Sequence, residues 1–370
     1  MSPDVLIIGG GLMGCAIATE LASRGARVRV LERAVVGAEA SSAAAGILSP
    51  SIESHDDHEM FDLGMKSLTL HEAFADRALE LGVDTGFTKR GTLRIAFDEA
   101  TLERITTIAN SLSERGVDCR VLDRAASLEL EPAISDKILG SLFVSDEAKL
   151  DPAALVHAYA AAAKHEGASF LCGHQVRSIE TDSNHDLTVH TDKADLQCEL
   201  LVIAAGAWTA ALEGIPLSSS SVFPIRGQMV AVRSEELRIE RVVFGDGGYV
   251  LQRNAEILSG STEEHVGFDR DVTAEGLSAI LQHAMRVAPA MARCRFERAW
   301  SNFRPGTIDG RPLIGRSRDP HVFIASGHYR HGILLAPITA RAIAQLIFDE
   351  SLEATIDAFD PMRFERGISC

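Results

Sequence analysis

Basic residues are the scarcer charge in this sequence, and no run of five of them occurs. Its 370 residues include 36 Lys and Arg against 52 Asp and Glu, a formal net charge of −16 at pH 7. Nucleic-acid binding needs clustered Lys and Arg that neutralise phosphates. We therefore expect no nucleic-acid partner, and we attribute the dispersed acidity to solubility.

Long apolar runs and paired cysteines are also missing. No apolar stretch approaches the roughly 20 residues of a spanning helix, so we expect no membrane span. The N-terminus lacks the basic leader of a signal peptide. The cysteines form no CxxC pair and are typical of free thiols in a reducing compartment, which favours a cytoplasmic protein. They are Cys15, Cys119, Cys172, Cys198, Cys294 and Cys370.

The N-terminal segment combines a glycine-rich turn with strand and helix patterns. Residues 4–8 predict a buried parallel strand, residues 12–24 a helix, and residues 26–31 a second strand. The turn Gly9–Gly14 joins the first strand to the helix, and Glu32 follows the second strand. With both strands, the helix and the acid in place, this context favours a dinucleotide site over a structural turn.

Each residue of this fingerprint has a physical role. Gly9 allows the tight turn, Gly11 lets backbone N–H groups approach a pyrophosphate, and Gly14 lets helix and strand pack closely. Glu32 is placed to accept hydrogen bonds from a ribose. The fingerprint alone leaves NAD and FAD open.

The segment after the second strand, residues 37–50, is rich in small side chains. Such side chains let a bulky planar group lie against the backbone, and the hydroxyls of Ser41 and Ser42 can donate to phosphate. This composition favours a flavin over further regular βα units. A flexible surface loop is the alternative.

The rest of the chain alternates helix and strand patterns without a Pro/Ser/Gly linker. Helices are expected over 60–82, 99–115, 123–131, 151–166 and 273–287, with a closing helix to about Phe348. Strands are expected at 91–97, 168–172, 175–181, 186–191, 197–204 and 321–325, and strands and turns over 222–262. The length predicts two lobes that share the chain discontinuously.

Four further motifs occur in order, namely Ser42–Leu48, Ala204–Trp208, Pro224–Gln228 and Asp309–Gly315. Together with the fingerprint, they resemble the FAD-dependent amine and D-amino-acid oxidase superfamily over essentially the whole chain. Residues 327–339 resemble the C-terminal signature of bacterial glycine oxidases, which serve the thiamine thiazole pathway. His331 departs from this signature, where Asn is usual.

The resemblance implies an α/β fold with an α+β second lobe. A Rossmann-like FAD-binding domain would consist of residues 1–82, 146–219 and 301–370. A substrate domain with an antiparallel sheet would consist of residues 83–145 and 220–300. The flavin would lie between these intertwined lobes, the usual place for a small-molecule site. We also expect a homo-oligomer.

The implied reaction transfers a hydride from the Cα of glycine, sarcosine or D-alanine to flavin N5, and oxygen then yields hydrogen peroxide. It needs no nucleophile and no metal, but it needs a cation for the substrate carboxylate, and Arg suits this role because its planar fork pairs two oxygens. Related sarcosine oxidases tether their flavin through Cys. Residues 300–310 contain no Cys, which favours non-covalent FAD.

The resemblance also implies site residues. Arg304 matches the carboxylate-clamping arginine, Arg330 would contact substrate or close over the flavin, and Tyr249 matches a tyrosine that shares the carboxylate. A surface ion pair is the alternative for Arg304, and a sheet aromatic for Tyr249. The expected cofactor contacts are Gly9, Gly11, Leu12, Met13, Gly14, Glu32, Arg33, Ser41, Ser42, Gly46, Ile47, Leu48, Val176, Ala205, Gly206, Trp208, His331, Gly332, Ile333 and Leu334.

Several alternatives stay open at this point. A D-amino-acid dehydrogenase would keep the flavin and pass its electrons to a quinone. The flavin domain of a tRNA-modifying enzyme is disfavoured by the charge and by the lack of a methyltransferase partner, and a non-catalytic FAD-binding module is a separate alternative. Residues 55–59 contain two His and three acids, but no second cluster completes a metal site.

Overall fold

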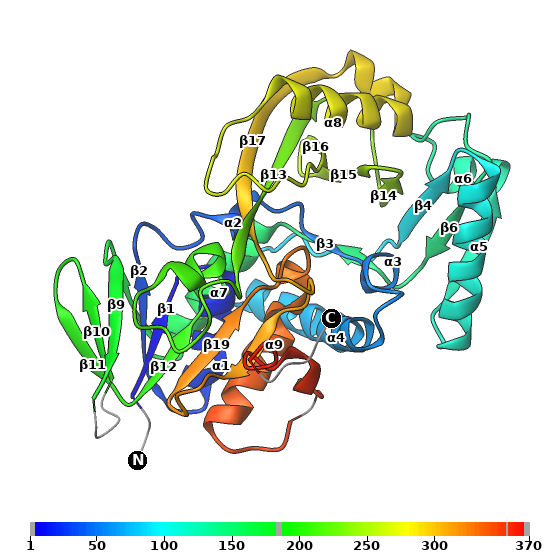
Figure 1. Cartoon of the computed structure of the whole chain (residues 1–370). Helices are drawn as coiled ribbons and strands as arrows, with labels where there is room; N and C mark the ends of the chain where they lie inside the picture. The colour runs from blue at the N-terminus through cyan, green and yellow to red at the C-terminus, as the bar shows by residue number, and fades with distance from the viewer. Residues whose placement is uncertain (1–3, 183–186, 353, 366–370) are drawn as a thin grey trace.

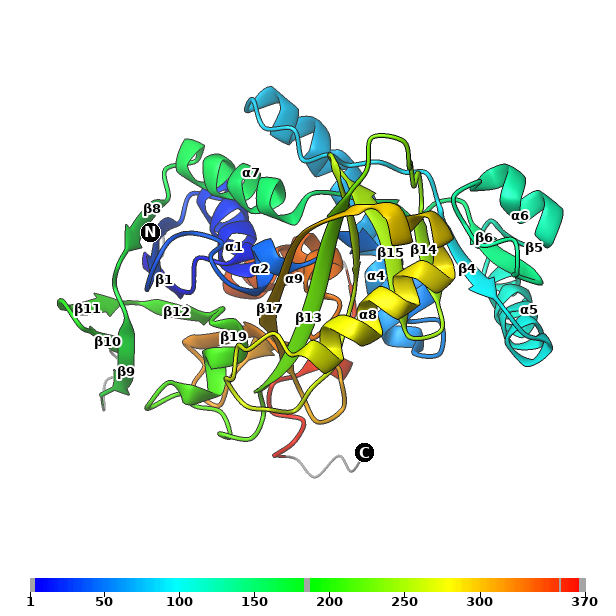
Figure 2. The same ribbon diagram turned by 90° about the horizontal axis from the view of Figure 1, so that it is seen from above.

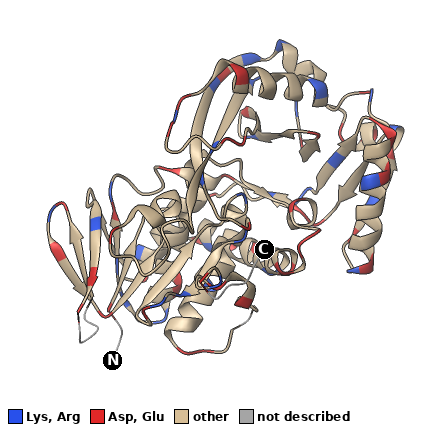
Figure 3. Cartoon of the chain, in the orientation of Figure 1, with Lys and Arg blue, Asp and Glu red and all other residues tan. Residues whose placement is uncertain are grey.

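The computed structural model describes residues 4–182, 187–352 and 354–365. Two large sheets and their helices form an α/β fold, as the sequence predicts. In Figure 1 the first sheet lies at the lower left and the second extends across the top and right, while Figure 3 shows acidic and basic residues dispersed over both. Within the described ranges, no helix is long and apolar enough to cross a membrane.

The first sheet has six strands in the order β18-β19-β12-β1-β2-β8. They are β1 (Asp4–Ile8), β2 (Arg27–Glu32), β8 (Ser169–Cys172), β12 (Leu200–Ile203), β18 (Leu313–Arg316) and β19 (Val322–Ser326). All neighbours run parallel except β18 and β19. The carboxyl ends of β1, β2, β12 and β19 therefore meet at one edge, where open α/β sheets bind their ligands.

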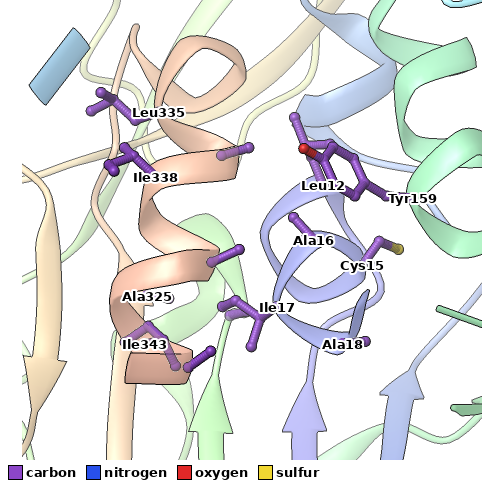
Figure 4. Packing of buried hydrophobic residues seen from close by; sticks show 14 of the residues in the cluster. Leu12, Cys15, Ala16, Ile17, Ala18, Tyr159, Ala325, Leu335, Ile338 and Ile343 are labelled. Carbon is purple, nitrogen blue, oxygen red and sulfur yellow. The ribbon is translucent and has the colours of Figure 1, made fainter. Parts of the chain in front are cut away.

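Alternate residues of β1 face different layers, as strand geometry requires. Val5 and Ile7 pack against helices, whereas Leu6 and Ile8 pack against a small three-stranded sheet. The helices are α1 (Leu12–Ser23), α4 (His58–Glu80), α7 (Pro152–His165) and α9 (Gly332–Ile347), and the small sheet contains β9 (Val176–Thr181), β10 (Leu187–Thr191) and β11 (Asp195–Cys198). Figure 4 shows α9, which carries Ile338 and Ile343, next to α1, which carries Ile17.

The second sheet has eight strands in the order β17-β13-β16-β15-β14-β4-β6-β5. They are β4 (Thr92–Ala96), β5 (Cys119–Asp123), β6 (Gly140–Val144), β13 (Phe223–Arg233), β14 (Val242–Gly245), β15 (Gly248–Arg253), β16 (Glu256–Gly260) and β17 (Arg295–Gly306). Its helices are α5 (Glu99–Glu114), α6 (Arg124–Leu130) and α8 (Ala274–Val287). Val230 and Val250 face α8, which lies across β13 in Figure 2, and Met229 and Tyr249 belong to the opposite face.

Several short elements lie between the longer ones or near the end of the chain. They are α2 (Ala40–Ala43), β3 (Ile47–Leu48), α3 (Pro50–Glu53), β7 (Ala148–Lys149) and the 3₁₀ turns Gly206–Ala211, Pro289–Arg293 and Asp357–Phe359. The small-residue segment therefore includes one short helical turn and a two-stranded pairing between β3 and β7.

One expected strand differs from the structure. Residues 197–204 were expected to form a single strand, but the chain changes partner at Glu199. Cys198 pairs antiparallel with Leu187 in the small sheet, whereas Leu200 pairs parallel with Val5 in the first sheet. Both halves bury apolar residues, so the pattern of hydrophobicity does not mark the break. Residue 186, the first of another expected strand, lies outside the described ranges.

Candidate active site

A cavity of about 860 Å³ lies between the two sheets. Gly9, Glu32, Ala204 and Ser326 line it from the carboxyl ends of four parallel strands of the first sheet. Met229 and Tyr249 line it from the face of the second sheet that α8 leaves uncovered. This volume is in the upper range of small-molecule sites.

The glycine turn is shaped for a closely approaching ligand. Gly9 has φ of +110°, and a Cβ there would overlap the carbonyl of Ala204. A Cβ at Gly14 would overlap the carbonyl of Gly9, so this glycine serves the packing of α1 against β1. The hydroxyl of Ser41 accepts a hydrogen bond of 3.0 Å from the N–H of Leu12, which brings the small-residue segment to the N-terminus of α1. A helix N-terminus of this kind favours phosphate.

Glu32 occupies the next strand end. Its carboxylate is buried and accepts hydrogen bonds from the N–H groups of Gly10 at 2.9 Å and Ala34 at 2.8 Å. Arg33 lies with its guanidinium 3.9 Å from the centre of the Trp208 ring and pairs with Glu39. These residues line the same end of the cavity as the glycine turn, where the adenosine half of a dinucleotide would lie.

Three side chains expected at the substrate lie together at another part of the cavity. Arg304 comes from β17, Tyr249 from β15, and Arg330 from the loop before α9. Burial raises the pKa of Tyr249, with the charge of Arg304 opposing it, so the phenol stays protonated and can donate a hydrogen bond.

The two arginines have different partners. Arg304 donates from Nη1 to the carbonyl of Thr262 at 3.1 Å and from Nη2 to the hydroxyl of Ser261. Both hydrogen-bond partners are neutral, and Arg304 forms no ion pair with a carboxylate among the described residues. Arg330 forms an ion pair with Glu263, and its side chain is 51% exposed.

Most of the expected cofactor contacts line this one cavity. They are Gly9, Gly11, Leu12, Met13, Glu32, Arg33, Ser41, Gly46, Ile47, Val176, Ala205, Gly206, Trp208, Gly332 and Ile333. Gly332 and Ile333 form the first turn of α9, which gives the cavity a second helix N-terminus.

Five expected contacts lie behind the cavity wall. Gly14 packs against Gly9, as described above. The Ser42 hydroxyl donates to the carbonyl of Gly37, and the Leu334 carbonyl accepts from Ser67 and His71. Leu48 is fully buried in the core. His331 is buried at the start of α9, and burial lowers its pKa to about 4, so its imidazole is neutral near pH 7.

The motif-based reasoning did not single out several residues of the cavity. Ser261 and Asn302 lie near the end of β16 and in β17, and Glu53 ends α3. No motif marks Glu53, but its position just beyond the small-residue segment is a signal that a search for nearby acids would have found.

The cavity fits a flavin dinucleotide and gives no indication of a metal site. Two helix N-termini, a positive-φ glycine, a buried carboxylate and a wall of small side chains suit a long, anionic and planar group. Among the described residues, no cluster of His, Cys, Asp and Glu could hold a metal ion. Within residues 55–59, Asp57 accepts from the N–H of Met60 and pairs with Arg311.

The fold and the cavity together define a dinucleotide-binding protein. The family described as FAD dependent oxidoreductase (DAO) matches residues 4–346, and the chain belongs to it. FAD is therefore its cofactor and electron transfer its chemistry.

Within this family, the chain is similar to ThiO/ThiG proteins and to glycine oxidases. The bifunctional protein ThiO/ThiG of Trichormus variabilis is 32% identical over the whole chain, which spans 56% of that protein. The chain thus covers about half the length of these bifunctional relatives. Glycine oxidase of Geobacillus kaustophilus is 33% identical over 93% of this chain and 92% of its own. The crystal structure titled glycine oxidase from Geobacillus kaustophilus superposes with a TM-score of 0.94 over 98% of this chain and 99% of that one, at 32% identity.

Proposed function

We propose that the chain oxidises glycine and other small amines, such as sarcosine and D-alanine, with FAD and oxygen. The products are glyoxylate or another 2-oxo acid, ammonia or an amine, and hydrogen peroxide. The observation that carries this proposal is Arg304, which lies in the cavity beside Tyr249 with only neutral described partners. The similarity to glycine oxidases and to ThiO/ThiG proteins supports it, and it suggests a role in thiamine thiazole synthesis.

Arg304 binds the substrate carboxylate in this proposal. A guanidinium has five N–H donors, and hydrogen bonds to Ser261 and Thr262 leave donors for a bidentate pair. Those two bonds also fix the plane of the group, which reduces the entropy lost on binding. Tyr249 donates its phenol proton to the same carboxylate. The substrate is thereby oriented, with Cα directed away from the arginine.

When bound, FAD supplies the acceptor for the hydride that leaves Cα, and the protein supplies orientation and electrostatics. The N–H groups of Gly332 and Ile333 at the start of α9 would hold the flavin ring, at a helix N-terminus that favours negative charge. Glu32 binds the ribose, and the N-terminus of α1 binds the pyrophosphate. None of the described cysteines lines the cavity, which supports non-covalent binding.

The lobes follow the same proposal. Residues 1–82, 146–219 and 301–370 bind FAD, and residues 83–145 and 220–300 cover the substrate. β17 crosses the division at residue 300, so one strand belongs to both lobes. We also propose a cytoplasmic homo-oligomer, in keeping with the isolated cysteines and the soluble composition.

A second candidate differs only in the electron acceptor. The crystal structure titled L-proline dehydrogenase from P. horikoshii superposes with a TM-score of 0.90 at 25% identity, over 99% of this chain. That resemblance favours a dehydrogenase with a carrier in place of oxygen as the alternative.

Anaerobic mixing with glycine, followed by air, separates these functions. We expect glycine or sarcosine to bleach the flavin, D-alanine to bleach it more weakly, and L-alanine hardly at all. Air should restore the colour and consume oxygen. Bleaching without oxygen consumption would favour the dehydrogenase, and a preference for L-alanine would contradict the substrate assignment.

A further inference from the structure

Glu53 is an acidic side chain at the positively charged part of the cavity. It ends α3 and lines the cavity together with Tyr249, Arg304 and Arg330. The charges of Arg330 and Arg304 both act on its carboxylate, and Glu53 in turn acts on Tyr249. None of the described residues donates a hydrogen bond to this carboxylate. It is therefore an acceptor that a ligand can use.

A second buried carboxylate holds α3 in place. Glu147, which is 1% exposed, accepts hydrogen bonds through Oε1 from the N–H of Ser51 at 2.8 Å and from that of Ile52 at 3.2 Å. These are N–H groups of the first turn, which have no partner within the helix. Pro50 also packs against α4, where a Cβ at Gly64 would lie 2.8 Å from Pro50 Cβ. The backbone that carries Glu53 is thus fixed from two sides.

The other acids of the cavity wall do not have this position. The described acids there are Glu32, Glu39, Glu53 and Asp56. Glu32 and Glu39 belong to the adenosine part, and Asp56 is exposed to solvent. Of these four acids, Glu53 is the one on whose carboxylate the charges of both arginines act.

We infer that Glu53 receives the amine of the substrate and takes a proton from its ammonium form. This inference rests on the proposed function, in which Arg304 and Tyr249 hold the carboxylate of an amino acid. A zwitterionic substrate has a cationic end as well, and a partly buried carboxylate beside the clamp recognises it. Acids that lack an amine gain nothing from Glu53, so this residue selects amino acids over other small carboxylates.

The proton and electron balance is simple. The ammonium gives one proton to the Glu53 carboxylate, which leaves a neutral amine and a neutral carboxylic acid. The nitrogen lone pair then forms the C=N bond as the hydride departs from Cα, so the substrate loses two electrons and the flavin gains two. Glu53 returns its proton to water before the next turnover.

The protonation state of Glu53 suits this role. Burial raises its pKa to about 7, with Arg330 and Arg304 opposing the shift. The groups that face it are Arg304 of β17, Arg330 before α9 and Tyr249 of β15, and His55, Asp56 and Arg94 also line the cavity. A carboxyl that titrates near neutrality exchanges protons readily at physiological pH. The ionised form is the active one, so activity should rise as pH increases through this value.

Glu53→Gln tests the inference, with Glu59→Gln as a matched control on an exposed surface ion pair of α4. We expect kcat/KM for glycine to fall about ten- to hundredfold in E53Q, the loss of one charge-assisted hydrogen bond. Inhibition by acetate, which has a carboxylate but no amine, should not weaken. The rise of kcat/KM near pH 7 should vanish in E53Q and persist in E59Q.

Unchanged glycine kinetics in an E53Q protein with normal FAD content would overturn the inference and leave the proposed function intact. An equal loss of acetate binding would also overturn it, because the effect would then be general damage to the cavity. A wild-type flavin that glycine does not bleach would overturn the proposed function and the inference together.

Glu147 acts through α3 as a positioning residue and has its own test. Glu147→Ala removes the acceptor for the first turn of α3 and should raise KM for glycine without changing acetate inhibition. Glu147→Gln keeps an acceptor oxygen for both N–H groups, so glycine KM should stay within about fivefold of wild type, which corresponds to about 1 kcal/mol for one weakened hydrogen bond. Equal effects of both substitutions on glycine KM would show that Glu147 does not position Glu53.

Discussion

Gly227 leaves the space that the Arg304 guanidinium occupies. The glycine lies on β13 directly opposite Asn302 of β17, and both line the cavity. A Cβ built at Gly227 would lie 2.6 Å from Cζ of Arg304, whereas an ordinary contact begins at 3.4 Å. Gly227 does not have a positive φ, so alanine fits the backbone there. Gly227→Ala should therefore fold and displace the arginine.

The size of the effect follows from these distances. The guanidinium must move by about 0.8 Å or more, the difference between 3.4 and 2.6 Å. Displacements of about 1 Å in substrate-positioning groups cost up to about a hundredfold in rate. We expect kcat/KM for glycine to fall about ten- to hundredfold, with most of the loss in KM, because the clamp binds the carboxylate equally in the bound substrate and in the transition state.

The assay is steady-state oxygen consumption, with FAD content and melting temperature as checks on folding. A double-mutant cycle with Arg304→Ala tests whether the effect passes through this side chain. In the Arg304→Ala background, adding Gly227→Ala should change kcat/KM by less than about twofold, since no guanidinium is left to displace. Additive losses, or a Gly227→Ala enzyme with wild-type KM, would refute the assignment of Arg304 as the clamp.

Three further predictions follow from the same structure. Acid precipitation should release FAD into the supernatant, and yellow colour retained in the pellet would contradict non-covalent binding. Arg304→Lys keeps the charge but loses the fork, so glycine KM should rise about ten- to hundredfold at normal FAD content; an unchanged KM would transfer the role to Arg330. Burial raises the pKa of Glu147 to about 7 from 4.5, so the folded state holds this proton more tightly than the unfolded chain. Wild type should therefore lose stability relative to Glu147→Gln as pH rises from 4.5 to 7, by on the order of 3 kcal/mol in denaturant unfolding, and parallel pH profiles would exclude this effect.

The features that the sequence predicts best are local ones. The first strand, the glycine turn and the first helix are contiguous, and each glycine has a steric reason within the same unit. The sequence also predicted two helix N-caps. Asp151 precedes Pro152 of α7 and accepts a hydrogen bond from the N–H of Ala153 at 3.0 Å, and Asp123 caps α6 in the same way. Such signals depend on few residues and on short-range geometry.

Features that depend on residues far apart in the sequence were harder to predict. The sequence of β17 did not predict a strand, because it lacks a regular alternation of apolar and polar residues. Trp300, Asn302 and Arg304 line the cavity, and they are of mixed polarity. A cavity wall is neither core nor surface, and hydrophobic periodicity does not describe it. Glu53 was missed for a related reason, since Glu147, which fixes its helix, lies far away in sequence.

The two arginines show why a site needs tertiary structure as well as motifs. Arg304 and Arg330 were both candidates for contact with the substrate, and their sequence motifs do not show which of them is free to bind an anion. In the fold, Arg330 is half exposed and already paired with the carboxylate of Glu263, so a substrate must displace that partner to bind there. Arg304 is held by a hydroxyl and a carbonyl, which orient it without neutralising it. An anion can therefore pair with Arg304 without displacing a bound carboxylate, whereas at Arg330 it gains only the difference between two carboxylates.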